Sequence, residues 1–114
     1  MNAVKLILIL GVLASFQAFA KDLDLRCIAS HNSQVVLDRN VKLLSGSRGI
    51  FFGKASGLDL FLTHSGDSTV ELQALNIYEP SRSYATALVA AEGSFIELSI
   101  WKREFLMEVR CTSF

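Results

Sequence analysis

The sequence predicts a small all-β domain, an eight-stranded antiparallel meander whose first and last strands are joined by a disulfide. Three observations lead to this prediction. Apolar residues alternate with period two along most of the chain, and turn residues interrupt the alternation about every ten residues. The only two cysteines, Cys27 and Cys111, fall on the apolar faces of the first and the last predicted strand.

The N-terminal residues 1–20 have the features of a cleaved secretory signal peptide. Lys5 provides the positive charge, and Leu6–Leu13 is an apolar stretch too short to span a bilayer as a helix. Ala18 and Ala20 are the small residues that signal peptidase requires. We therefore expect a secreted or periplasmic protein with one mature domain, residues 21–114, and no stable membrane anchor after cleavage.

Charge and cysteine content narrow the possible partners and the compartment. The full chain carries 11 basic and 11 acidic residues, and removal of Lys5 leaves a net charge near −1. This balance does not favour nucleic acid as a partner. In an oxidising compartment two cysteines usually pair, with two buried free thiols as the alternative. A Cys27–Cys111 bridge would stabilise so small a domain by about 4.5 kcal/mol in the chain-entropy model.

Eight segments carry the alternation, and each is expected to form one strand. They are residues 22–30, 34–44, 49–55, 58–64, 69–78, 82–92, 94–101 and 104–111. In the first, Cys27 and its apolar neighbours alternate with polar residues. In the second, Arg39 interrupts the apolar face, which predicts a bulge or a position at the end of a barrel. Phe51 and Phe52 are adjacent in the third, so one of them must point outward.

The fourth segment places leucines on one face before the polar loop HSGDS, and the fifth shifts its apolar phase after Ala74, which predicts a bulge or a change of exposed face. The sixth segment, Arg82–Glu92, is ambiguous because its alanines favour a helix. We predict a strand, since both neighbours are strands and Glu92-Gly93 resembles a tight hairpin turn. The last two segments alternate regularly, with a turn at Lys102-Arg103 between them.

The cysteines also bear on how the meander closes. A disulfide brings the two Cα atoms within about 7 Å, so the first and last strands must be neighbours or face each other across a core. Adjacency of these strands in a meander closes a barrel, and closure removes exposed sheet edges. We therefore favour a small β-barrel, with a two-sheet β-sandwich as the alternative.

The sequence contains no catalytic signature. The loop HSGDS lacks the G-x-S-x-G pattern of a nucleophile elbow, and its residues are those of ordinary turns. The only histidines, His31 and His64, are too few for a typical metal site without other converging ligands. No glycine-rich loop precedes a helix. We accordingly predict no enzyme, no metal and no cofactor, and a small hydrolase is the weakest alternative.

Candidate contact residues are aromatic or charged side chains near turns and strand ends. They are Trp101, Phe52, Tyr78, Tyr84, Arg48 and His64. The loop Ser45–Gly49 (SGSRG) could offer backbone N–H groups to an anion, with Arg48 as the counter-charge. This loop resembles the Ser/Gly loop of exported lysozyme inhibitors, which are also small disulfide-bonded β-barrels; the resemblance implies an inhibitor-like plan, and no residue role follows from it.

These observations predict a binding or inhibitor-like module that acts through protein contacts. The inward positions are rich in large apolar residues, which favours a filled core over a ligand cavity. The alternative is a small lipocalin-like carrier of an apolar ligand, for which the alanine-rich segment 82–92 would leave space. The expected partner is thus an exported protein or a small apolar ligand.

Overall fold

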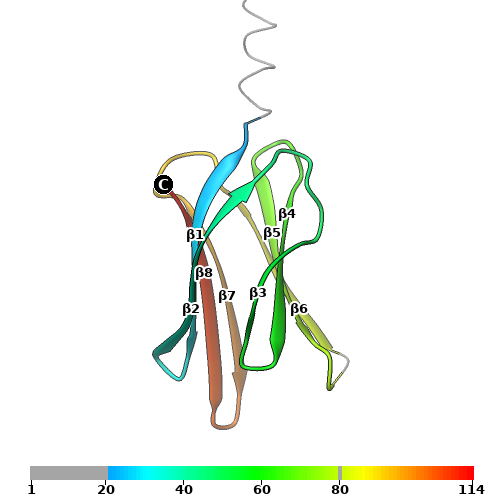
Figure 1. Cartoon of the computed structure of the whole chain (residues 1–114), viewed down its shortest axis with the longest axis vertical. Coiled ribbons are helices and arrows are strands. Elements are labelled where there is room, and N and C mark those ends of the chain that lie inside the picture. The colour runs from blue at the N-terminus through cyan, green and yellow to red at the C-terminus, as the bar shows by residue number, and fades with distance from the viewer. Residues whose placement is uncertain (1–20, 80) are drawn as a thin grey trace, which may run out of the picture.

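The computed structural model describes residues 21–79 and 81–114, and the predicted signal peptide lies outside these residues. The strands form two four-stranded antiparallel sheets (Figure 1). The terminal sheet, of order β2-β1-β8-β7, contains β1 (Leu23–His31), β2 (Gln34–Leu43), β7 (Phe95–Lys102) and β8 (Phe105–Ser113). The central sheet, of order β3-β4-β5-β6, contains β3 (Ile50–Ala55), β4 (Leu58–His64), β5 (Thr69–Asn76) and β6 (Ser81–Leu88).

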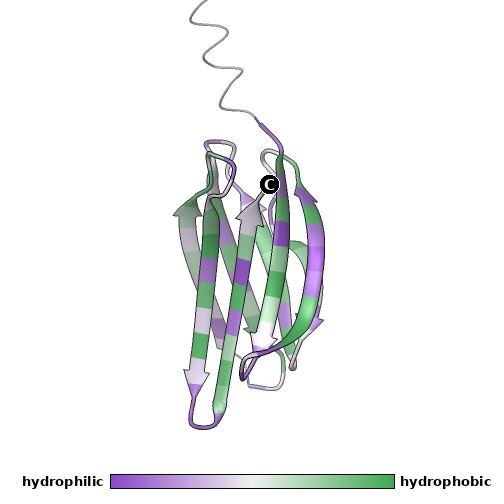
Figure 2. Ribbon diagram, turned by 90° about the vertical axis from the view of Figure 1, so that its left-hand side faces the viewer, coloured by the Kyte–Doolittle hydropathy of each residue, from purple (hydrophilic) through white to green (hydrophobic). Residues whose placement is uncertain are grey.

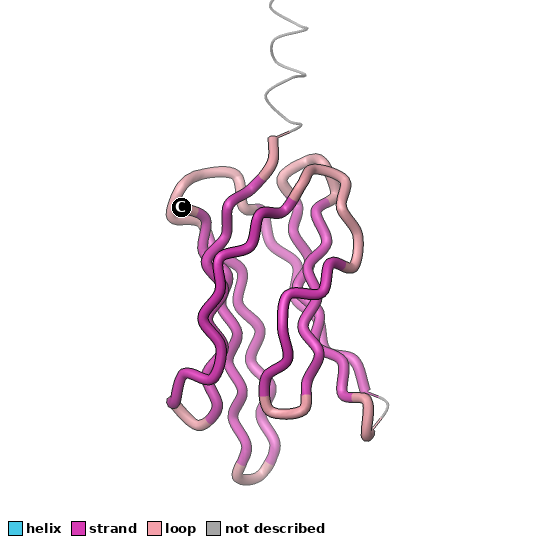
Figure 3. The backbone as a smooth tube through the Cα atoms, viewed as in Figure 1, coloured by secondary structure: helices cyan, strands magenta, loops and turns pink. Residues whose placement is uncertain are grey.

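The prediction of a closed barrel is wrong, and the fold is the alternative, a two-sheet sandwich. The strands follow one another around the molecule as in a meander, but within the described residues no backbone ladder joins β2 to β3 or β6 to β7. The chain crosses between the sheets at both of these places (Figure 3). We call them the β2/β3 seam and the β6/β7 seam. The end that carries Lys21 and the C-terminus is the upper end in Figure 1.

Side chains, in place of a ladder, fill the β2/β3 seam. A Cβ atom added at Gly53 would lie only 2.8 Å from Leu37 Cδ2, so the β3 backbone lies directly against that side chain. The Arg39 guanidinium donates a hydrogen bond of 3.0 Å to the Phe52 carbonyl. The β3 register shifts between Phe51 and Gly53, which takes Phe52 out of the ladder with β4.

The bulges do not fall where the sequence predicts them. Arg39 stays in regular register opposite Cys27, and the β1/β2 register shifts between Ala29 and Ser30 instead. β5 keeps a regular register with both neighbours as far as Asn76. Neither a bulge nor a change of exposed face occurs after Ala74, because the alternation continues with Ala74 buried and Leu75 on the outer face as an apolar outer residue.

The predicted alternation and the predicted disulfide are both confirmed. Figure 2 shows hydrophobic and hydrophilic residues alternating along the strands of the terminal sheet. Large apolar side chains from both sheets fill the core, among them Leu25, Leu43, Leu60, Leu62, Leu72, Ile96 and Met107. Cys27 and Cys111 lie opposite each other in the β1/β8 register, are fully buried and are bonded.

The ambiguous segment 82–92 is mostly strand, since β6 covers Ser81–Leu88. The predicted hairpin turn at Glu92-Gly93 is wrong, because residues 89–94 cross from the central to the terminal sheet. Val89, at the start of this crossing, is fully buried and covers the upper end of the core. The described residues contain no helix long and apolar enough to cross a bilayer.

Candidate functional site

The exposed members of the predicted contact set lie far apart in the fold. Arg48 is in the upper β2–β3 crossing and Tyr78 is in the lower loop between β5 and β6. Trp101, which is 82% exposed, pairs with Leu106 on the outer face of the terminal sheet. Tyr84 lies on the outer face of the central sheet. These residues therefore do not form one surface.

Two members of the set are buried, so their prediction as surface residues is wrong. Phe52 is only 4% exposed because the β3 bulge turns it toward the core, and its neighbour Phe51 is outside with 54% of its surface exposed. His64 ends β4 on the core side and is 1% exposed. Alternation along the strand assigns one of the two phenylalanines to the outside, but it cannot say which one when a bulge intervenes.

The HSGDS loop uses its polar groups to shape itself. His64 Nδ1 accepts a hydrogen bond from the Gly66 N–H at 3.3 Å, and His64 Nε2 is buried without a partner. Asp67 Oδ1 accepts the Thr69 N–H at 3.1 Å, and the hydrogen bonds from Thr69 lower the pKa of the Asp67 carboxyl. Both side chains thus stabilise the turn between β4 and β5.

The structure gives little support to the predicted anion site at the Ser45–Gly49 loop, because three of its five N–H groups already have acceptors. Those of Ser45, Ser47 and Gly49 donate to Asp22 Oδ1, Leu44 O and Thr63 Oγ1 at 3.0, 3.0 and 2.9 Å. In addition, the Ser47 carbonyl accepts the His64 N–H at 2.8 Å. These hydrogen bonds hold the upper crossing against the core and leave few donors for a ligand.

A row of four residues, three of them aromatic and the fourth a glutamine, crosses the outer face of the central sheet. Phe51 pairs with Phe61, Phe61 with Gln73, and Gln73 with Tyr84, so the four residues lie side by side across all four strands. We call them the aromatic row. Phe51 and Tyr84 are 54% and 66% exposed, and Phe61 is partly buried between its neighbours.

The rings of the aromatic row do not form one flat platform. The Phe51 and Phe61 centroids are 5.7 Å apart and the two rings are tilted by 59°, which is close to the edge-to-face geometry that aromatic pairs prefer.

Few free charges border the aromatic row. On one side, Lys54 and Asp59 form an ion pair with a Nζ–Oδ1 distance of 3.6 Å. On the other, Gln73 donates a hydrogen bond to Glu71. Arg82, opposite Leu75 near the edge of the face, is exposed and forms no ion pair with a described residue. Among the described residues, the face therefore has an apolar centre bordered by the positive charge of Arg82 on one side and the negative charge of Glu71 on the other.

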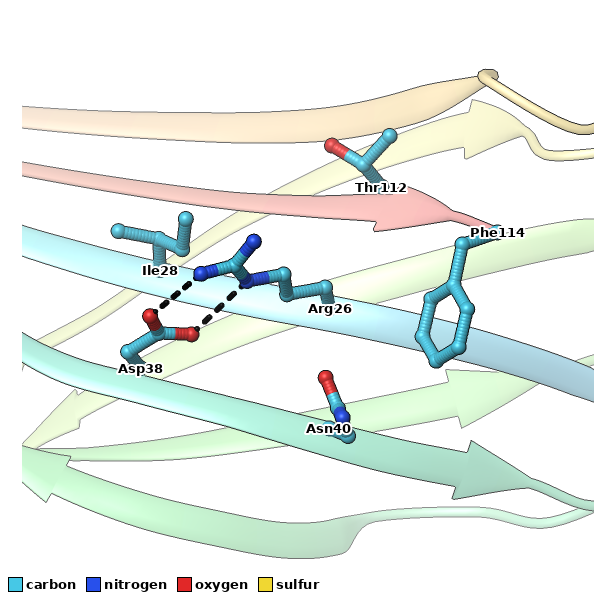
Figure 4. Close-up of a pocket in the computed structure, with 6 residues that line it drawn as sticks. All are labelled: Arg26, Ile28, Asp38, Asn40, Thr112 and Phe114. Atoms are coloured by element: carbon cyan, nitrogen blue, oxygen red, sulfur yellow. Dashed lines mark hydrogen bonds and ion pairs between the residues drawn. The ribbon is translucent and has the colours of Figure 1, made fainter.

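The outer face of the terminal sheet combines two arginine–carboxylate pairs with exposed apolar side chains, among them Trp101 and Phe95. Arg26 binds Asp38 through two hydrogen bonds of 3.1 and 2.8 Å, which lower the pKa of that carboxyl (Figure 4). These residues line a shallow open depression of about 810 Å³ (Figure 4). Arg110 pairs with Glu97 at 2.8 Å and lies 4.2 Å over the Phe95 ring.

Sequence reasoning missed Phe61 as a surface residue. The leucines on either side of it point inward, so its outward direction follows from alternation. Its position between Phe51 on β3 and Gln73 on β5 depends on the register of the strands, which the sequence pattern does not contain. The register is therefore what turns scattered outer residues into a surface.

Residues 21–79 and 81–114 contain no group of three or more histidine, cysteine, aspartate and glutamate side chains placed to hold a metal ion. Comparison with known protein families, with curated proteins and with solved structures finds no match to this chain. What the protein does is therefore argued from the geometry of its surfaces.

Proposed function

We propose that this protein is an exported binding module that contacts another exported protein through the outer face of its central sheet. The observation that carries the proposal is the alignment of Phe51, Phe61 and Tyr84 at one level across the sheet, with two of the three well exposed. Aromatic side chains are enriched at protein interfaces, and contiguous exposed apolar patches commonly mark them.

The face has the dimensions and the composition of a contact centre. Three strand spacings separate Phe51 from Tyr84, or roughly 14 Å at about 4.8 Å per strand. A partner suited to this face has an apolar patch bordered by a carboxylate that pairs with Arg82. On the terminal sheet, Arg26 and Arg110 are already paired with Asp38 and Glu97, so these two cations are not free to bind a partner.

An apolar carrier receives less support from the interior. The middle of the sandwich is filled by fully buried leucines and by Ile96 and Met107, as expected for a packed core. The disulfide is compatible with an oxidising compartment, either extracellular or periplasmic, in which both proteins would meet.

Site-specific photo-crosslinking in the cell of origin tests this proposal. A benzophenone amino acid at Thr86, which lies on the same outer face as Tyr84, should give one protein adduct of defined mass. The matched probe at Ser99, on the outer face of β7, should not give that adduct. Adding Phe51→Ser and Tyr84→Ser should remove the adduct while the unfolding temperature shows that the variant still folds.

Three results would contradict the proposal. One is the absence of an adduct from Thr86 in a folded protein. Another is the same set of adducts from Thr86 and Ser99, which would indicate nonspecific contact. The third is an adduct with the mass of two copies of this chain, which would assign the face to self-association.

A further inference from the structure

The β6/β7 seam opens at its lower end into a cleft of about 430 Å³ between the two sheets. Its floor is apolar and comes from both sheets, with Leu58 on β4 and Ile100 and Phe105 on β7 and β8. Its rim carries the hydroxyl groups of Ser81 and Ser83 on β6. The volume lies within the range of small-molecule sites.

The cleft exists because the inner face of β6 is made of small residues. Ser81, Ser83 and Ala85 point toward the terminal sheet and leave space beside it. In the β2/β3 seam, the longer side chains of Leu37 and Arg39 fill the corresponding space. The hydroxyls of Ser81 and Ser83 have no hydrogen bond to another described residue. They therefore remain available as donors and acceptors at the mouth of the cleft.

One cation stands at this mouth. Lys102 Nζ lies 3.1 Å from Glu79 Oε2, and the pair bridges β7 to the loop after β5. The Glu79 side chain is 75% exposed and belongs to a loop, so water can easily replace its contact with Lys102. Glu79 thus shows that a carboxylate can bind Lys102 at this rim, which also carries the two serine hydroxyls.

We propose that this cleft binds a small carboxylic acid with one apolar ring or short chain. The apolar group lies on Leu58, Ile100 and Phe105, and the carboxylate takes the place of Glu79 on Lys102 with the serine hydroxyls as further donors. This site is separate from the aromatic row, which is on the outer face of the central sheet. The inference goes beyond the protein contact proposed above and does not depend on it.

Titration with 3-phenylpropionate, followed by NMR of the backbone amides, tests the site. We expect saturable shifts at Ser83 and Ile100, and no comparable shifts at Tyr84 or Arg26. Lys102→Gln should weaken binding of the acid but leave binding of the neutral 3-phenylpropanamide unchanged. Glu79→Gln should tighten binding of the acid, because it removes the competing carboxylate.

A matched pair of variants separates the cleft from the sheet face. Ser83→Leu fills the cleft and should weaken binding at least about tenfold, or 1.4 kcal/mol. Thr86→Leu places the same side chain on the same strand but on the outer face, and should leave binding unchanged. The inference is overturned by the absence of saturable shifts up to about 10 mM probe, by equal effects of the two leucine variants, or by an unchanged affinity in Glu79→Gln.

The two proposals can fail separately. Loss of the Thr86 crosslink with intact binding of the acid would remove only the protein contact. A crosslink that forms while the acid fails to bind would remove only the cleft ligand.

Discussion

The terminal sheet is assembled from the two ends of the chain, whereas the central sheet is one continuous meander. The terminal sheet contains the Cys27–Cys111 disulfide and has two arginine–carboxylate pairs on its outer face. The central sheet has no disulfide in its described residues, and its outer face carries the aromatic row instead. The disulfide joins β1 and β8, which are distant in sequence, whereas the Arg26–Asp38 and Arg110–Glu97 pairs each join the two neighbouring strands of a hairpin.

The two seams between the sheets also differ, because large side chains close one of them and small residues line the other. Leu37, Gly53 and Arg39 close the β2/β3 seam through side-chain contacts. The β6/β7 seam is lined by small residues and opens into a cleft at its lower end. One break in the ladder is therefore part of the packing, and the other provides space for a ligand.

The largest expected effect concerns the terminal sheet. Replacing both Cys27 and Cys111 with Ala should reduce the free energy of unfolding by about 4.5 kcal/mol, because the bridge closes a loop between residues 84 positions apart. Denaturant unfolding under oxidising conditions measures the loss, and reduced wild-type protein serves as the control. An unchanged midpoint would mean that the terminal sheet holds together without its cross-link, and the contrast between the sheets would disappear.

A smaller effect is expected at the packed seam. Gly53→Ala places a methyl group against Leu37, and overpacking of this kind costs about 1–3 kcal/mol, at the lower end here because the Leu37 side chain can move. Combining it with Leu37→Ala should cost less than the sum of the two single changes. Strict additivity in this double-mutant cycle would show that the two residues do not close the seam together.

The smallest effect concerns the ion pair of Arg26 with Asp38. Because Arg26 lowers the folded-state pKa of Asp38, the pair stabilises the protein above the unfolded pKa of about 4, and this contribution is lost as the pH falls through the lowered folded value. Wild type should thus have a higher unfolding temperature than Asp38→Asn near neutral pH, and the difference should vanish in acid. Salt should also reduce it. A difference that persists at the acid end would exclude the ion pair as its cause.

Much of the fold follows from the sequence because its determinants are local. Alternation and turn residues locate all eight strands, and the cysteines identify the neighbouring first and last strands. Alternation cannot predict whether β2 and β3 join the two sheets into a closed barrel. That outcome depends on whether β3 meets β2 through backbone hydrogen bonds or, as here at Gly53, through contact with the Leu37 side chain. The same limit applies to the aromatic row, in which lateral register aligns residues from four strands, and to Phe52, which a bulge turns inward.

The separation of 84 positions between Cys27 and Cys111 has a consequence for the order in which the domain can be completed. β1 pairs with β8, so a chain that becomes available from its N-terminal side keeps one edge of β1 unpaired and the Cys27 thiol free until β8 has appeared. The hairpins of the central sheet require only neighbouring segments and can form before that. Formation of the native disulfide therefore records that the domain has all eight strands, and a product truncated before β8 would retain a free Cys27 thiol.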